Sequence, residues 1–582
     1  MKSAPRSAAF VSLPDLALIG DRRSCALLDK QGNVVWYCPE RFDKPAMLAY
    51  LLDPEKGGSW QLLSNGLSFK EREYIAESAI LRTRLSCPAG ELVLEDWMPL
   101  NGRFYGICRR LSAAPLPVTL RLTPRPNYAR SRAVLELREE KHACIDFNLH
   151  LYASHPLEIQ EDAVCCNIPE GEKAWFALAE KTFECHEILI EESYRQTLEN
   201  WAKVASHISY KGPYEKEVHN SLRLLRMLTF HLNGGVIAAA TTSLPEVLEG
   251  DRNYDYRYVW LRDAAMIVSA LTRAGSDGVE ERQFLSFICS AMHRLKEPVV
   301  PFFTLDEQPA PHEQEIPLQG YRNSRPVRIG NNANNQLQLD ASSNVLIAAK
   351  VIYNAFNTRE HWETIRMLAN YVCEHWQEPD HGMWEEKTKK HFTSSKVIAS
   401  CSLEYIAKHS QDEQEKKRWL QAAGQIRLFI EENCLTPEGA YAAYAGAQTV
   451  DVSAVLFPIW GFVDAETAEI IKTVEVLERD YCYNHLYRRQ LINFDAKKEG
   501  VFLAGSLWVA QYWVMRKNWQ KVEASLDAIL PYMNDIGIMP EEADPDTGEW
   551  LGNLPQTFVH ASLIGTLIDY KRARYDKDKT ED

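Results

Sequence analysis

The spacing of apolar residues changes near residue 191, and this change constrains the fold more than any other feature of the sequence. Before it, segments such as 26–38, 118–128 and 142–155 alternate apolar and polar residues and are separated by turn residues, which is typical of β-strands. After it, apolar residues recur at the i, i+3, i+4 spacing of α-helices. A chain that switches period once predicts two structural units of different class.

The first unit, residues 1–190, is predicted to be an antiparallel β-sandwich. The Gln-Gly-Asn sequence at 31–33 supports a hairpin, because Gly and Asn tolerate a positive φ. Residues 191–213 follow as a helical linker: the helical spacing over 192–208 ends at a Lys-Gly-Pro sequence, and no Gly/Ser-rich run is present.

The second unit, residues 214–575, contains roughly twelve amphipathic helical stretches, such as 214–232, 336–356 and 502–518. Several long polar or aromatic loops join them. This pattern favours a toroid of six antiparallel helix pairs, whose loops gather at one end and can form a pocket. A helical-repeat solenoid is the alternative, but no 34- or 40-residue period recurs. Residues 576–582 form a charged tail.

The overall composition is that of an ordinary globular chain, with 46% hydrophobic and 25% charged residues. The 80 acidic and 65 basic residues give a net charge of −15, which disfavours nucleic acid and anionic membranes as partners. No run of eighteen apolar residues predicts a membrane span, and no signal peptide is recognisable. The 13 cysteines are scattered without a C-x-x-C pair, which favours reduced thiols and a cytoplasmic location. The sequence leaves the oligomeric state open.

Two loops of the helical unit combine arginine with other polar or aromatic side chains. Residues 251–266 hold four aromatic residues, three Arg and three Asp. Aromatic rings stack on sugar faces, and Arg and Asp bind sugar hydroxyls. The alternative is a structural Arg262–Asp263 pair at a helix start. Residues 320–340, with three Arg and five Asn, are either an anion site or a solvated loop.

Two further loops each carry a pair of glutamates. Glu385 and Glu386 follow Trp384, and an indole against a carboxyl group raises its pKa, as a general acid requires. A surface turn is the alternative. Glu541 and Glu542 follow a proline. Two loop carboxylates on a helical toroid suit glycoside hydrolysis, although composition alone does not exclude a carbohydrate-binding module or a lyase.

No metal or cofactor site is predicted. Asp544, Asp546 and Glu549 suggest a calcium loop, but their spacing misses the EF-hand pattern and a turn explains them more simply. No His pair has a zinc-ligand spacing, and the common nucleotide-binding and nucleophile-elbow motifs are missing from the sequence.

Several of these segments, in this order, resemble the glucoamylase-like glycoside hydrolases of family 15, in particular the bacterial branch that contains glucoamylases and trehalases. The resemblance runs nearly end to end. It implies an N-terminal antiparallel β-sandwich (supersandwich), an all-α (α/α)6 barrel, and an inverting mechanism without a metal. The segments that carry it are 16–53, 234–246, 255–266, 320–331, 381–385, 391–396, 499–508 and 537–564.

The resemblance also implies roles for individual residues. Glu385 corresponds to the general acid and Glu541 to the general base, with their neighbours Glu386 and Glu542 as rivals. In an inverting enzyme the two acting carboxyl groups lie roughly 6.5–9.5 Å apart. The implied substrate-binding residues are Trp260, Arg262 and Asp263 around the terminal glucose, Trp384 beside the acid, and Arg328 and Glu499 on the aglycone side.

The function expected first is therefore an inverting, exo-acting α-glucoside hydrolase of glucoamylase type. It would release β-glucose from non-reducing ends of α-glucans or short gluco-oligosaccharides. The alternatives are an α,α-trehalase that uses the same two glutamates and a non-catalytic glucan-binding protein. Tyr254 stands where relatives often have Trp, so the fit to one particular sugar, the linkage and the chain length stay open.

Overall fold

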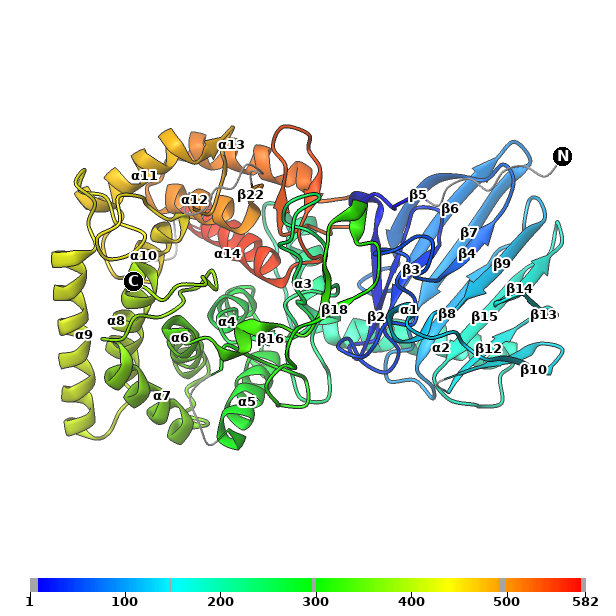
Figure 1. Ribbon diagram of the computed structural model, residues 1–582, viewed down its shortest axis with the longest axis horizontal. Coiled ribbons are helices and arrows are strands. Elements are labelled where there is room, and N and C mark those ends of the chain that lie inside the picture. Colours follow the sequence, from blue (N-terminus) through cyan, green and yellow to red (C-terminus); the bar gives the residue numbers. More distant parts are fainter. Residues whose placement is uncertain (1–8, 147, 296–299, 491–498, 577–582) are drawn as a thin grey trace.

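The computed structural model describes residues 9–146, 148–295, 300–490 and 499–576. The chain forms two lobes that lie side by side, a helical barrel and a β-sandwich (Figure 1). The predicted fold class, an antiparallel sandwich followed by an (α/α)6 barrel, is confirmed.

The sandwich consists of two antiparallel sheets. Gly32, with a φ of +78°, turns the chain between β2 and β3, as expected from the sequence. One sheet has the strand order β1 (Ala17–Gly20), β2 (Cys25–Leu28), β3 (Val34–Tyr37), β4 (Ser59–Leu63), β9 (Val118–Thr123), β14 (Ala163–Ile168) and β13 (Leu157–Gln160). The other has the order β10 (Leu135–Glu139), β11 (His142–Ile145), β12 (Leu149–Ala153), β15 (Ala174–Ala179), β8 (Gly106–Leu111), β7 (Gly90–Trp97), β6 (Leu81–Cys87) and β5 (Ser68–Tyr74).

Strands β1 to β3 are buried on both faces, unlike β5, which has mostly exposed or half-buried residues. A half-buried strand alternates, whereas a strand covered on both faces does not. The first three strands are covered twice because one face packs in the sandwich and the other meets the barrel. Trp36 of β3, for example, donates its indole N–H to the carbonyl of Ala240 at 3.0 Å.

A long helix, α2 (Glu187–Ser206), leads from the sandwich to the barrel. The domain boundaries after residues 190, 213 and 575 stay predictions, and residues 577–582 of the charged tail lie outside the described part of the chain. Within the described ranges, twelve helices follow α2: α3 (Glu215–Met227), α4 (Ala264–Arg273), α5 (Val279–Arg294), α6 (Leu339–Phe356), α7 (Trp362–His375), α8 (Thr393–Ala407), α9 (Glu413–Asn433), α10 (Leu456–Ile459), α11 (Ala468–Asp480), α12 (Leu503–Met515), α13 (Trp519–Ile529) and α14 (Thr557–Arg574).

The even-numbered helices α4 to α14 form the inner ring, and the odd-numbered helices α3 to α13 pack outside it. Helix α14 contacts both α12 and α4, which closes the ring. The inner helices α8, α12 and α14 are buried almost all round, so the expectation of amphipathic helices is wrong for them. A helix that neighbours enclose on every side has no polar face to present to water.

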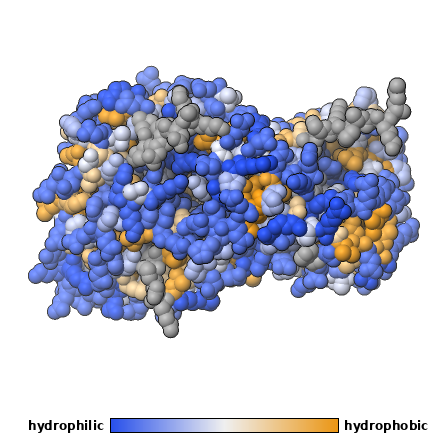
Figure 2. Space-filling view, in the orientation of Figure 1, coloured by the Kyte–Doolittle hydropathy of each residue, from blue (hydrophilic) through white to orange (hydrophobic). Residues whose placement is uncertain are grey.

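The two lobes share one continuous set of buried apolar side chains. Charged and polar contacts cross the same interface, including Arg72 to Asp535 at 2.7 Å and the Gln319 N–H to Asp53 at 2.9 Å. Hydrophilic residues cover most of the face that Figure 2 shows. None of the described helices combines the length and the apolar character that a membrane span needs.

Candidate active site

A cavity of about 1060 Å³ opens at one end of the barrel. The residues that line it come from loops that precede the inner helices α4, α6, α8, α12 and α14. These helices therefore direct their N-terminal ends toward the cavity. Five glutamates besides Glu313 line the cavity: Glu246, Glu385, Glu386, Glu499 and Glu541.

Residues 256–260, which precede α4, donate hydrogen bonds to the two glutamates of interest. The Tyr256 hydroxyl donates a hydrogen bond to the Glu541 carboxylate at 3.1 Å. The Trp260 indole N–H donates to the Glu385 carboxylate at 2.6 Å. The two rings lie 5.5 Å apart between centroids. The relative position of the two carboxyl groups is thus set by residues 256–260.

Glu385 lies in a tight turn with a φ of +58°, a left-handed conformation that non-glycine residues adopt at a cost. Arg262 Nη1 is 3.6 Å from its carboxylate. The Arg262 guanidinium is itself held by the Asp263 carboxylate and the Met383 carbonyl, both at 3.0 Å. Burial raises the pKa of Glu385, and the positive charge of Arg262 opposes that rise.

Glu541 is more deeply placed, with 3% of its surface exposed. Burial, together with the negative charge of Glu246, raises its pKa to about 8, while Arg489 and the Tyr256 hydrogen bond act in the opposite direction. The Tyr256 hydroxyl also lies 3.3 Å from Glu246, so it bridges the two carboxylates. In the unliganded site Glu541 therefore binds its proton more tightly than an ordinary glutamate does.

A wall of paired charges continues from Glu246. Arg489 Nη2 is 2.5 Å from Glu246 and also contacts Glu499, and Arg252 Nη1 is 3.2 Å from Glu499. Among the described residues, Glu246, Glu499 and Glu542 bring carboxylate oxygens within 4.8 Å of one another, the one such group that a metal ion could use. Arg489 already stands among these three carboxylates, at 3.5 Å from Glu542, and supplies positive charge there.

The structure brings most of the predicted site residues together. The residues of the predicted set that line the cavity are Arg262, Arg328, Trp384, Glu385, Glu499 and Glu541. Trp260 and Asp263 are buried behind this lining, Trp260 stacked on Phe302 with ring centroids 4.3 Å apart. Of the two rivals, Glu386 faces the cavity and accepts a hydrogen bond from Gln490, whereas Glu542 is fully buried beside the cavity wall.

Four residues with contacts to this site were missed from the sequence: Glu246, Arg252, Tyr256 and Arg489. A signal for Tyr256 was present, because aromatic residues at 256, 258 and 260 alternate along the chain and period-two side chains share one face. No local pattern marks Glu246 or Arg489, which are about 240 residues apart and meet through the closure of the ring.

The comparisons with known proteins bear on this geometry. The sequence model for "Glycosyl hydrolases family 15" matches residues 212–493 and 507–567, more than half of the chain. The chain belongs to glycosyl hydrolase family 15. The model for "Trehalase-like, N-terminal" matches residues 7–177, which include the sandwich strands. The resemblance seen in the motifs is confirmed, and this family 15 protein is a glycoside hydrolase.

Two relatives and one solved structure illustrate the similarity. Trehalase 1 of Sulfolobus acidocaldarius is 28% identical, over 97% of this chain and 99% of that protein. The trehalase of Mycobacterium tuberculosis is 26% identical, over 99% and 92%. A bacterial glucoamylase complexed with acarbose superposes with a TM-score of 0.75 over 98% of this chain and 96% of that one. At 12% identity, this last match shows the fold alone.

Gly552 gives a direct test of how Glu541 is held. A Cβ at Gly552 would lie 2.5 Å from Glu541 Oε2 and 2.7 Å from Glu541 Cβ. Gly552→Ala should therefore displace Glu541 and lower kcat by about tenfold or more, because small misplacements of acting groups are costly. The measurement is steady-state hydrolysis of the best substrate.

Gly548→Ala is the matched control, because Gly548 lies four residues earlier, on the other side of β24 (Trp550–Leu551), has a φ of +74° against +75° for Gly552, and has open space around its Cβ position. Both variants place an alanine at nearly the same positive φ. Equal losses of kcat in the two variants would contradict the contact between Gly552 and Glu541.

Proposed function

We propose that this family 15 hydrolase cleaves α,α-trehalose with inversion, with Glu385 as general acid and Glu541 as general base. The observation that carries the chemistry is that both carboxyl groups line one cavity and are held by the same segment. Glu385 donates its proton to the glycosidic oxygen. Glu541 takes a proton from a water molecule, which attacks the anomeric carbon from the opposite face.

Contacts within the site support this choice over the neighbouring glutamates. Only Glu385 of the first pair receives the Trp260 N–H and lies beside Arg262. Glu386 is engaged by Gln490 instead. Glu542 belongs to β23 (Glu542–Ala543), and successive residues of an extended strand point to opposite sides, which directs Glu541 to the cavity and Glu542 away from it.

The remaining polar groups suit the two glucose units. Arg262, fixed by Asp263, is placed to hold hydroxyls of the glucose whose bond is broken. Arg252, Arg489, Glu246 and Glu499 offer fixed donors and acceptors to the second sugar. A wall of paired charges binds a compact, hydroxyl-rich ring through hydrogen bonds, because its groups are already oriented before the ligand arrives.

The choice of trehalose over longer glucans rests on the relatives. Proteins named trehalase match nearly the whole chain at 26–28% identity, whereas the glucoamylase match at 12% supports the fold. The glucoamylase-type activity expected first from the sequence uses the same two glutamates and is the alternative that the same assay tests. All thirteen cysteines are unpaired, which supports the further proposal of a reducing, cytoplasmic location.

The anomer of the released glucose tests the proposal. Inversion of trehalose yields one β-glucose from the attacked carbon and one α-glucose from the leaving sugar, and proton NMR within the first minutes resolves the two. We expect turnover of trehalose and little turnover of maltose, isomaltose or maltotetraose. Preferential release of β-glucose from maltotetraose would favour the glucoamylase-type activity, and release of α-glucose alone would contradict inversion.

Substitution tests the two roles. Glu385→Gln and Glu541→Gln should each lower kcat by at least about a thousandfold, because each removes a proton-transfer group. Glu386→Gln should cost much less, since this residue is proposed to do no proton transfer. A larger loss in Glu386→Gln than in Glu385→Gln would transfer the acid role to Glu386.

The pKa of Glu541 predicts the alkaline limb of the pH–rate profile. The productive form has a proton on Glu385 and none on Glu541, so the pair must hold one proton in total. In the free site this single proton resides on Glu541, whose pKa is about 8, so the pair loses it above about pH 8 and kcat/KM should fall there. Tyr256→Phe removes a hydrogen bond that lowers the pKa of Glu541, so the limb should move to higher pH. An unchanged limb in Tyr256→Phe would contradict the assignment of this limb to Glu541.

A further inference from the structure

We infer that the β-sandwich domain positions the two catalytic carboxyl groups, and that Arg257 is the residue through which it does so. This inference rests on the proposed function for its activity measurement. The sandwich then is part of the catalytic apparatus, and Arg257 is a positioning residue that touches neither the cavity nor a substrate.

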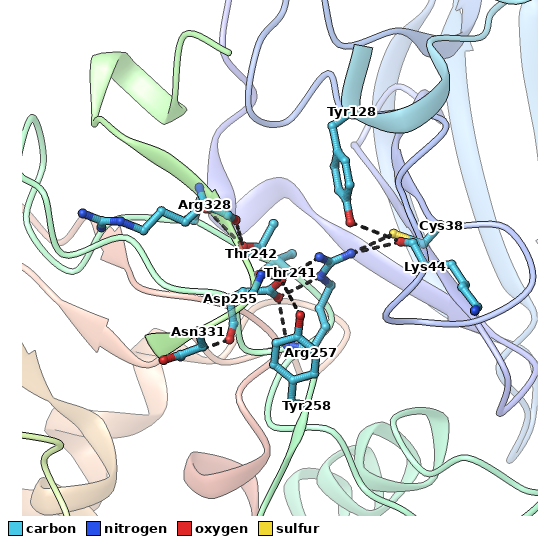
Figure 3. Close-up of polar contacts among 12 residues, drawn as sticks. Cys38, Lys44, Tyr128, Thr241, Thr242, Asp255, Arg257, Tyr258, Arg328 and Asn331 are labelled. Atoms are coloured by element: carbon cyan, nitrogen blue, oxygen red, sulfur yellow. Dashed lines mark hydrogen bonds and ion pairs between the residues drawn. The ribbon is translucent and has the colours of Figure 1, made fainter. Parts of the chain in front are cut away.

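Arg257 lies in the segment that holds Glu385 and Glu541, yet its side chain points away from the cavity. It is 1% exposed and forms two hydrogen bonds with Asp255, at 2.9 and 2.7 Å. Its Nη1 donates to the carbonyl of Lys44 at 3.1 Å and lies 3.7 Å from Cys38 Sγ. Figure 3 shows this guanidinium between Asp255 of the barrel and the sandwich residues Cys38 and Lys44.

Aromatic rings of the sandwich also surround the Arg257 guanidinium. Together with Cys38 and Lys44 they form what we call the sandwich socket. The guanidinium carbon is 5.4 Å from the ring centroid of Tyr128 and 5.9 Å from that of Trp36. The Tyr128 hydroxyl donates to the Lys44 carbonyl at 3.4 Å, the same oxygen that receives Arg257. The planar guanidinium can contact all these groups at the same time, whereas the compact ammonium group of a lysine cannot.

On the barrel side, Asp255 ties the same segment to the next loop. Its carboxylate accepts the Gly330 N–H at 3.2 Å and lies 3.4 Å from the Tyr258 hydroxyl. The Thr242 hydroxyl, next to Asp255 in a β-bridge, donates to the Arg328 carbonyl at 2.7 Å. Figure 3 shows Thr242 and Arg328 on this side of the ion pair.

Main-chain hydrogen bonds hold the residues that connect Arg257 to the cavity. The Tyr256 and Tyr258 carbonyls accept hydrogen bonds from the main-chain N–H groups of Ala239 and Ala238, both at 2.9 Å, so the segment is held on both sides of Arg257. Adjacent side chains of an extended segment point to opposite sides. Arg257 in the sandwich socket therefore fixes Tyr256 on the other side, against Glu541, and nearby Trp260 against Glu385.

The test compares two arginines in equally buried ion pairs. Arg257→Lys keeps a cation beside Asp255 but loses the simultaneous contacts with Lys44 and Cys38. Arg109→Lys is the control: Arg109 pairs with Asp96 at 2.6 Å, both side chains are fully buried, and Arg109 lies 4.9 Å from the Trp60 ring, all inside the sandwich. Both variants should lower the melting temperature.

For the folded fraction of each variant, we expect Arg257→Lys to lower kcat by about tenfold or more and to move the alkaline limb of kcat/KM to higher pH, the direction also expected for Tyr256→Phe. Arg109→Lys should leave both unchanged. Wild-type kcat and pH profile in Arg257→Lys, or equal changes in both variants, would overturn the inference.

Hydrogen exchange provides a measurement that does not need activity. Peptides that cover residues 254–262 should exchange faster in Arg257→Lys than in the wild type, and as slowly as wild type in Arg109→Lys. Failure of the wild type to hydrolyse any α-glucoside would reject the proposed function while this exchange difference still tests the positioning role. Equal exchange in all three proteins would overturn that role.

Discussion

The site depends on keeping two carboxyl groups in one poorly solvated cavity while only one of them carries a proton. Burial favours the protonated form of both, and like charges nearby favour it further. The positive groups near them are placed unequally. Arg262 lies beside Glu385, whereas Arg489 is paired with Glu246 and acts on Glu541 through its charge. The two glutamates thus differ in environment although both are buried. The pKa of Glu541 is raised to about 8, so the proton that the proposed reaction needs on Glu385 must first leave Glu541.

The barrel supplies the place where these groups meet. Its inner helices α8, α12 and α14 are buried nearly all round, so their positions are set by packing and leave little freedom to the loops at their N-terminal ends. The residues that reach the cavity come from loops far apart in the sequence, and the contact of α14 with α4 and α12 brings the first and last of them together. The sandwich adds a second fixed support through the interface that Arg257 crosses.

Much of this could be predicted from the sequence. The single change of period at residue 191 predicted two units of different class, and the loop motifs directed attention to Glu385, Glu541 and Arg262, which line one cavity. Helical periodicity was a poorer guide to the inner ring, since helices enclosed on all sides carry no amphipathic pattern. Glu246 and Arg489 lay beyond sequence reasoning because their pairing depends on tertiary closure, and Arg257 because its partners are a backbone carbonyl and rings of another domain.

The wall of paired charges also constrains how such a cavity can change. Glu246, Glu499, Arg252 and Arg489 form a network in which each acid pairs with both bases, so replacing one of them leaves the remaining three with an unbalanced charge. An unpaired buried charge costs several kcal/mol, roughly 3–5 where such pairs have been broken. Single substitutions along this wall of this chain are therefore disfavoured as a route to another sugar specificity. The chain must exchange an acid and a base together, and intermediates that carry only one of the two changes are disfavoured by their own instability.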